Sequence, residues 1–258
     1  MDEREFILVV EAEAILAQVA FNGGSVVSIH EPRPRVDSMR LRPWTLMGDN
    51  LLSVRLARFA DEALPPDAVP AFRVALHHPR VGSECDWANL VAAFRYSDNE
   101  CALEPGADLA TVHEHRVNNV HEVGPWAWEE ARPYRDGDRR AIEPLLERFG
   151  AALRDKDPAA LRALLALKTV EICQALSLDL EQTELSQYRF FESFFECDDW
   201  RTSTLDPSRM ALVPEADGRL VRVTAPDGGV PFRGYGGGRP FGYDVVLSCI
   251  EETWVIAR

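Results

Sequence analysis

The sequence lacks the features that would place it in a membrane or on nucleic acid. Its first residues are acidic where a signal peptide would be basic, and the apolar run at 6–10 is too short for a signal core or a membrane span. Basic residues are outnumbered by acidic residues, 28 to 42, which gives a net charge of −14. A negative surface disfavours nucleic acid and anionic lipid as partners. We therefore expect a cytoplasmic protein that binds neither.

Paired thiols and catalytic motifs are missing too. The five cysteines are scattered, and no two of them form a CxxC motif: Cys85, Cys101, Cys173, Cys197 and Cys249. This pattern indicates reduced thiols and no disulfide framework. The glycine-rich stretch 227–243 lacks the Gly-Lys-Ser/Thr ending of a phosphate loop, and no Ser/His/Asp or Cys/His arrangement can be assembled. The sequence predicts no catalytic residue and no cofactor, and it favours a protein that is not an enzyme.

The first half of the chain carries β-strand patterns. Apolar and polar residues alternate at 15–21, 52–56, 72–76 and 90–96, and Asn22-Gly23-Gly24 supplies a hairpin turn. Short alternating strands separated by turns are typical of an antiparallel sandwich. No helical period precedes residue 139. We predict an antiparallel β-sandwich domain over residues 1–135.

Two segments of this half carry a resemblance. Val19–Val27, with its Asn-Gly turn, and the G-x-N-x-L-x-V pattern that begins at Gly48 resemble galactose-binding-like jelly-roll modules. The resemblance implies a jelly-roll arrangement, with sugar binding in some members and contacts alone in others. Turn chemistry also accounts for the same asparagines and glycines.

Residues 141–195 have helical periodicity almost throughout. Apolar side chains recur every three or four residues from 142 to 153, and Asp157-Pro158 supplies an N-cap followed by proline at the first helical position. Further apolar series follow at 161–167, 170–176 and 190–195. The preceding stretch, 124–140, has the prolines of a linker but carries Trp126, Trp128 and Tyr134. We expect its tryptophans to pack at a domain interface.

Strand patterns return after the helices. Residues 214–218 have the composition of a hairpin turn, residues 245–250 alternate, and Glu251-Glu252 is expected to turn the chain into a last strand. The helical pieces at 145–155 and 157–161, followed by a sheet that ends in Trp254-Val-Ile-Ala-Arg258, resemble the SnoaL-like, or nuclear-transport-factor-like, superfamily. The resemblance implies an α+β cone over residues 136–258, in which helices cross a concave sheet around a pocket.

Enzymes of that superfamily hold a carboxylate and hydrogen-bond donors in the cone, where they move a proton beside a carbonyl. Asp244 is the only obvious acid near the predicted sheet, and the first helix offers Phe149 and leucines but no tyrosine. The catalytic set of the superfamily is therefore not visible. An isomerase or hydrolase with a small-molecule pocket is kept as an alternative function.

A histidine cluster offers a further alternative, a metal-binding sandwich. His113 and His115 would share one face of a strand, and His121 follows closely. Two imidazoles at this spacing can chelate zinc, iron or nickel. No acid follows at the spacing that a cupin-like site needs. We therefore favour a structural or solvent-exposed role for the three histidines and predict no metal.

Two groups of residues are candidates for binding a protein partner. The glycine-rich stretch carries Arg233, Tyr235 and Arg239, which are residue types favoured in protein recognition. A plain hairpin connection explains the stretch equally well.

The acidic end of the 190–195 helix forms the second group: Glu196, Asp198 and Asp199. Only two of the 28 basic residues are lysines, which suggests a GC-rich bacterial source. We predict a non-catalytic protein-binding protein, in its most specific form a bacterial immunity protein that neutralises a cognate toxin.

Overall fold

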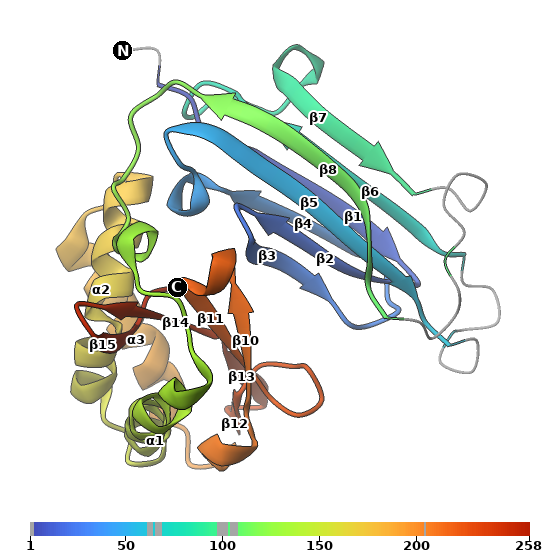
Figure 1. Cartoon of the computed structure of the whole chain (residues 1–258). Helices are drawn as coiled ribbons and strands as arrows, with labels where there is room; N and C mark the ends of the chain where they lie inside the picture. Colours follow the sequence, from blue (N-terminus) through green and yellow to red (C-terminus); the bar gives the residue numbers. More distant parts are fainter. Residues whose placement is uncertain (1–2, 61–63, 65–68, 97–102, 104–107, 204) are drawn as a thin grey trace. The chain divides into compact units, whose positions relative to one another are not determined.

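The computed structural model describes residues 3–60, 64, 69–96, 103, 108–203 and 205–258. The chain divides into two compact units, Met1–Gly124 and Pro125–Arg258 (Figure 1), and each has its own hydrophobic core. Within the described residues, no helix is long and apolar enough to cross a membrane. Four of the five cysteines are free thiols, and Cys101 lies outside the described residues.

The first unit consists of two antiparallel sheets. Their strand orders are β4-β1-β6-β7 and β3-β2-β5-β8. The strands are β1 (Ile7–Glu13), β2 (Ile15–Phe21), β3 (Gly24–Ile29), β4 (Arg35–Arg40), β5 (Gly48–Arg58), β6 (Ala71–His77), β7 (Leu90–Arg95) and β8 (Ala110–Asn119). Leu8 and Val10 of one sheet share a core with Val19 and Val54 of the other. The shared core makes this unit a sandwich-like pair of sheets, as the alternating pattern predicted.

The predicted hairpin turn at Asn22 is confirmed. Asn22 and Gly23 both have positive φ, 53° and 78°, which a tight turn between twisted strands requires. The Asn22 amide donates to the Trp44 carbonyl and to Asn50 Oδ1, both at 2.7 Å, and its own oxygen accepts the Leu51 N–H at 2.9 Å. The two asparagines therefore hold the hairpin and the start of β5 together.

The second unit combines three helices with two antiparallel sheets. The strand orders are β10-β11-β14-β15 and β13-β12-β9. The elements are α1 (Arg139–Arg154), α2 (Pro158–Leu176), α3 (Leu180–Phe195), β9 (Arg201–Ser203), β10 (Ala211–Glu215), β11 (Leu220–Thr224), β12 (Phe232–Gly236), β13 (Arg239–Tyr243), β14 (Val245–Ile250) and β15 (Thr253–Ile256). Among the described residues, the chain is therefore β-rich in both parts, and the α-helices lie in the second.

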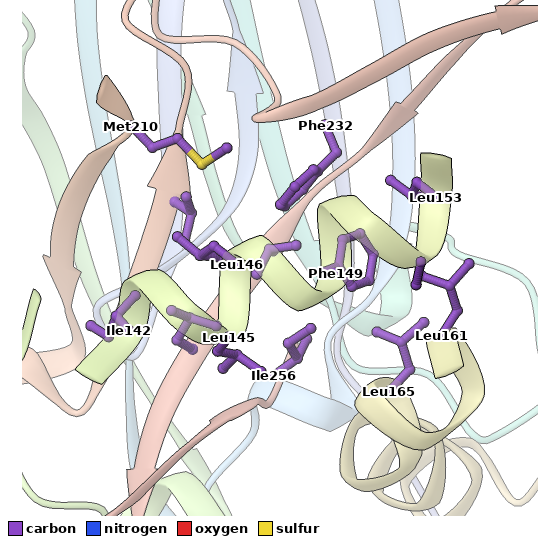
Figure 2. Close-up of a cluster of buried hydrophobic side chains, with 14 of the residues drawn as sticks. Ile142, Leu145, Leu146, Phe149, Leu153, Leu161, Leu165, Met210, Phe232 and Ile256 are labelled. Atoms are coloured by element: carbon purple, nitrogen blue, oxygen red, sulfur yellow. The ribbon is translucent and has the colours of Figure 1, made fainter. Parts of the chain in front are cut away.

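One face of α1 forms the centre of the second core. Figure 2 shows Ile142, Leu146 and Phe149 along this face, beside Phe232 and Ile256 from the sheets. The three α1 side chains are fully buried. Their spacing of three or four residues repeats the helical period, so the pattern in the sequence identifies the buried face. Burial of each such side chain contributes about 1.5–3 kcal/mol.

The sequence predicts the start of α2 correctly but does not predict the break between α2 and α3. Asp157 caps α2 through a 2.9 Å hydrogen bond from the Ala160 N–H, and Pro158 is the first helical residue, as predicted. The helical block is interrupted again at Ser177, whose φ is 53°, and Asp179 caps α3. The apolar series at 170–176 therefore belongs to α2, and α3 begins afresh.

The sequence predicts a domain boundary between residues 135 and 136. In the structure, residues 125–135 instead pack within the second unit. Trp126 and Trp128 are both 2% exposed. The Ala127 N–H donates to Glu171 in α2 at 2.5 Å, and the Arg132 N–H donates to the Cys249 carbonyl at 3.1 Å. The aromatic stretch is thus part of the fold of the second unit.

Candidate functional site

The predicted contact residues of the glycine-rich stretch lie on a β-hairpin. Residues 232–243 form β12 and β13, joined at Gly237 and Gly238, which both have positive φ. Arg233 and Tyr235 alternate with Gly234 on β12, so both side chains leave the same face of the sheet. Arg239 instead places its guanidinium 4.9 Å from the centre of the Phe194 ring in α3. The structure therefore separates Arg239 from the other two.

Arg233 is already paired with an acid of the turn that precedes β12. Its guanidinium donates two hydrogen bonds to Asp227, at 2.7 and 2.8 Å. These hydrogen bonds are the main reason that the pKa of Asp227 falls to about 2. Tyr235 lies under a second arginine, with Arg201 5.3 Å from its ring centre. This face of the hairpin is therefore basic and aromatic, and its Arg233 charge is largely compensated.

The predicted acidic residues lie where α3 ends. Glu196 is the C-cap residue and is exposed, as is Asp198. Asp199 accepts the Gly237 N–H at 2.7 Å, and its pKa is lowered chiefly by that hydrogen bond. Asp199 thus fixes the hairpin turn to the end of α3, which leaves Glu196 and Asp198 as the acids free to face a partner.

The sequence identified only the acidic C-terminal end of an exposed face of α3. Glu181, Leu185, Tyr188 and Glu192 follow one another at helical spacing, and Glu196 continues the row. Leu185 is 47% exposed and Tyr188 is 37% exposed. The Tyr188 hydroxyl donates to Glu192, which raises the pKa of the tyrosine. We call these five residues the α3 face, an apolar centre bordered by carboxylates. The repeat at 181, 185, 188 and 192 is the signal that could have revealed it.

The three candidate metal histidines do not form one site. His113 and His115 stack on one face of β8 with ring centres 6.2 Å apart, and Phe94 stacks on His113 at 4.9 Å. His121 instead makes an edge contact with His78, at 5.6 Å. Among the residues that the structure describes, no group of three or more His, Cys, Asp or Glu side chains could hold a metal ion.

A second cluster, which the sequence did not predict, surrounds Lys168. Its ammonium lies 4.8 Å from the centre of the Tyr243 ring, at the end of β13. The same ring meets Phe149 of α1 at 5.3 Å and Phe191 of α3 at 5.7 Å, and the Tyr243 hydroxyl is hydrogen-bonded to Gln187. All three helices therefore converge on one tyrosine. We call these five residues the lysine–tyrosine cluster.

Lys168 occupies a position that helical periodicity assigns to the core. The buried Leu161 and Leu165 lie seven and three positions earlier in α2, and the side chain of Lys168 is itself half-buried. A single lysine within this apolar row is the signal that could have revealed the cluster.

Charges from three segments act on Lys168. Burial lowers its pKa to about 8, Asp244 opposes that shift, and Arg258 and Arg222 reinforce it. Arg222 in β11 forms ion pairs with Glu215, at 2.8 Å, and with Asp244. Asp244, the acid singled out in the sequence, is therefore paired with an arginine and is 51% exposed.

Comparison with protein-family models, curated proteins and solved structures found no match to this chain. The two candidate sites, the α3 face and the lysine–tyrosine cluster, are therefore interpreted from their own geometry and chemistry.

Proposed function

We propose that this protein is a non-catalytic binding protein and, in its most specific form, a bacterial immunity protein that binds and neutralises a cognate toxin in the cytoplasm. The observation that carries the proposal is the α3 face, where Leu185 and Tyr188 are exposed between carboxylates. The four described free thiols suit a reducing compartment. The helices packed on antiparallel sheets suit the SnoaL-like cone that the sequence resembles.

The chemistry of the α3 face suits a basic protein surface with an apolar centre. Tyrosine is among the residues that contribute most to binding energy when a partner excludes water from it. Glu181, Glu192 and Glu196 would attract such a partner before contact, since charge complementarity raises the rate of association. The net charge of −14 acts in the same direction at longer range.

Co-expression tests this function directly. The toxin encoded by the neighbouring gene should arrest bacterial growth alone, and the full chain should restore growth and bind the purified toxin. The double variant Leu185→Ala/Tyr188→Ala should weaken binding at least about tenfold, whereas Val213→Ala, which removes a similarly exposed side chain on β10, should not. Undiminished protection by the double variant would exclude the α3 face. Failure of the full chain to bind would exclude neutralisation of that toxin.

The alternative of a small-molecule site is favoured by one observation, the lysine–tyrosine cluster. An isomerase or hydrolase of the SnoaL-like type would need a carboxylate free to take a proton, and the ion pair of Asp244 with Arg222 occupies the acid named for that role. Sugar binding in the sandwich has less support, because Asn22 and Asn50 use their amides in hydrogen bonds within the first unit.

A further inference from the structure

Two histidine rings meet where the chain leaves the first unit. The ring of His78, which follows β6, stacks on Phe6 with ring centres 4.3 Å apart. The ring of His121 meets the same imidazole edge-on, with centres 5.6 Å apart and an interplanar angle of 62°. The Asn119 side chain, at the end of β8, exchanges two hydrogen bonds with the His121 backbone, at 2.8 and 3.2 Å. His121 therefore fixes the start of the segment 120–124, with which the first unit ends.

The surroundings of His78 suit a neutral imidazole. Its Nε2 atom is buried and has no hydrogen-bond partner among the residues that the structure describes. A neutral imidazole can leave that nitrogen without a proton, whereas both ring nitrogens of an imidazolium are donors. Protonation of His78 in place would therefore leave a buried N–H without an acceptor, which is costly for any polar group and more so for a charged one.

Three segments bring charged groups to this imidazole. Arg4, on the N-terminal segment, donates to the carbonyl of the same residue at 3.1 Å, and His121 lies after β8. Burial is the main reason that the pKa of the buried ring is lowered, and both of these groups lower it further. The acids of the adjoining segments have partners: Glu5 pairs with Arg40 at 2.5 Å, and Asp86, in the β6–β7 connection, caps a short helix. Neither acid is left to offset the charge of an added proton.

We propose that His78 and His121 form an acid-sensitive latch, which holds the segment 120–124 to the first unit at neutral pH and releases it when His78 takes up a proton. Movement of the His121 ring away from His78 removes the second imidazole and lets water reach the new N–H. The step transfers one proton from solvent and breaks no covalent bond. The released form binds that proton more readily, so its population grows as the pH falls below about 6.5.

Proteolysis of the full chain measures the release. Endoproteinase Glu-C cleaves after glutamate, and Glu122 is an exposed residue of the segment. A synthetic peptide of residues 117–127, in which Glu122 is the only acid, corrects for the activity of the protease at each pH. We expect the corrected rate of cleavage at Glu122 to rise at least about threefold from pH 7.5 to pH 5.

Two phenylalanine variants identify the histidine responsible. His78→Phe retains a ring to stack on Phe6 and cannot take up a proton, so the rise in cleavage should disappear. It should also unfold no more readily than the wild type at pH 7, because it removes a buried nitrogen that has no partner. His113→Phe is the matched control, since it removes another half-buried histidine of the same unit, and the rise should remain.

A corrected cleavage rate that is independent of pH in the wild type would overturn the proposal, as would a rise that persists in His78→Phe. NMR of the wild type gives a readout that needs no variant. The ring signals of His78 and His121 should shift over one common pH range, together with the amide signal of His121. Separate titrations of the two rings, with no change at that amide, would equally contradict the latch.

Discussion

Glu171 and Arg258 form an ion pair inside the second unit, with side chains only 6% and 3% exposed. The carboxylate also accepts the Ala127 N–H, and the guanidinium lies 5.7 Å from the centre of the Trp126 ring. One pair thus joins α2, the segment at 126–127 and the end of the chain.

Removing one member of this pair should destabilise the protein strongly. Glu171→Gln keeps an acceptor for Ala127 but leaves the Arg258 charge buried without its counter-ion, and we expect a loss of about 3–5 kcal/mol. Arg258→Met should cost a similar amount. The double variant Glu171→Leu/Arg258→Met should cost less than either single change, because no charge is then buried alone. Urea unfolding measures all three, and single losses below about 1 kcal/mol would mean that the pair behaves like a surface pair.

Two glycines of the second unit should respond oppositely to alanine. A Cβ on Gly234 would lie 2.8 Å from the Arg201 carbonyl oxygen and 3.0 Å from the Trp200 ring, so β12 would have to shift, at a cost of about 1–3 kcal/mol. A Cβ on Gly150, inside α1, would meet Phe232 at 3.4 Å, an ordinary contact. Gly150→Ala should therefore stabilise by about 0.5–1 kcal/mol. Thermal unfolding of both variants checks the contrast, and equal shifts in Tm would contradict it.

Lys168 should reduce stability at neutral pH. Its pKa is about 8 in the folded chain, below its ordinary value of about 10.4. Between these values the unfolded chain binds more protons, so the contribution of Lys168 to stability improves as pH rises through this window. Lys168→Met should stabilise the protein by up to about 3 kcal/mol at pH 7, and the gain should shrink toward pH 10. A gain independent of pH would indicate packing alone.

His113 should titrate below its ordinary range. Burial is the main cause of its lowered pKa, and His115 adds to it. The unfolded chain then binds more protons just below pH 6.5, so the contribution of His113 to stability is lost as pH falls through this range. In His115→Gln the His113 resonance should titrate at higher pH by NMR. Stoichiometric metal that is lost in His113→Ala would contradict the structural role given to this histidine.

Turns and helix caps could be predicted from the sequence where a single residue type determines the backbone conformation. Asn22-Gly23 and Asp157-Pro158 are such cases, and both were identified. The interruption at Ser177 was missed because the apolar period continues across it, although the Asp179 cap marks the restart of the helix.

The candidate sites were harder to predict from the sequence, because they depend on the face of the helix or strand from which each side chain projects. Arg233 and Tyr235 alternate on β12, a strand whose glycine content resembles that of a loop. Lys168 appears in the sequence as one polar residue among leucines, and only the fold brings Tyr243 to it across about 75 residues of chain. No pattern within α2 alone could identify that partner.

The hydrogen bonds of the Asn22 side-chain amide affect how readily this residue deamidates. Asparagine followed by glycine is the dipeptide most prone to deamidation, in which the glycine nitrogen attacks the asparagine side-chain carbonyl. Here Trp44, Asn50 and Leu51 hold both ends of that amide, so the attack requires these hydrogen bonds to open first. The folded chain should therefore keep Asn22 intact on storage, and conversion to aspartate or isoaspartate at this position would mark molecules that have spent time with the first unit locally opened.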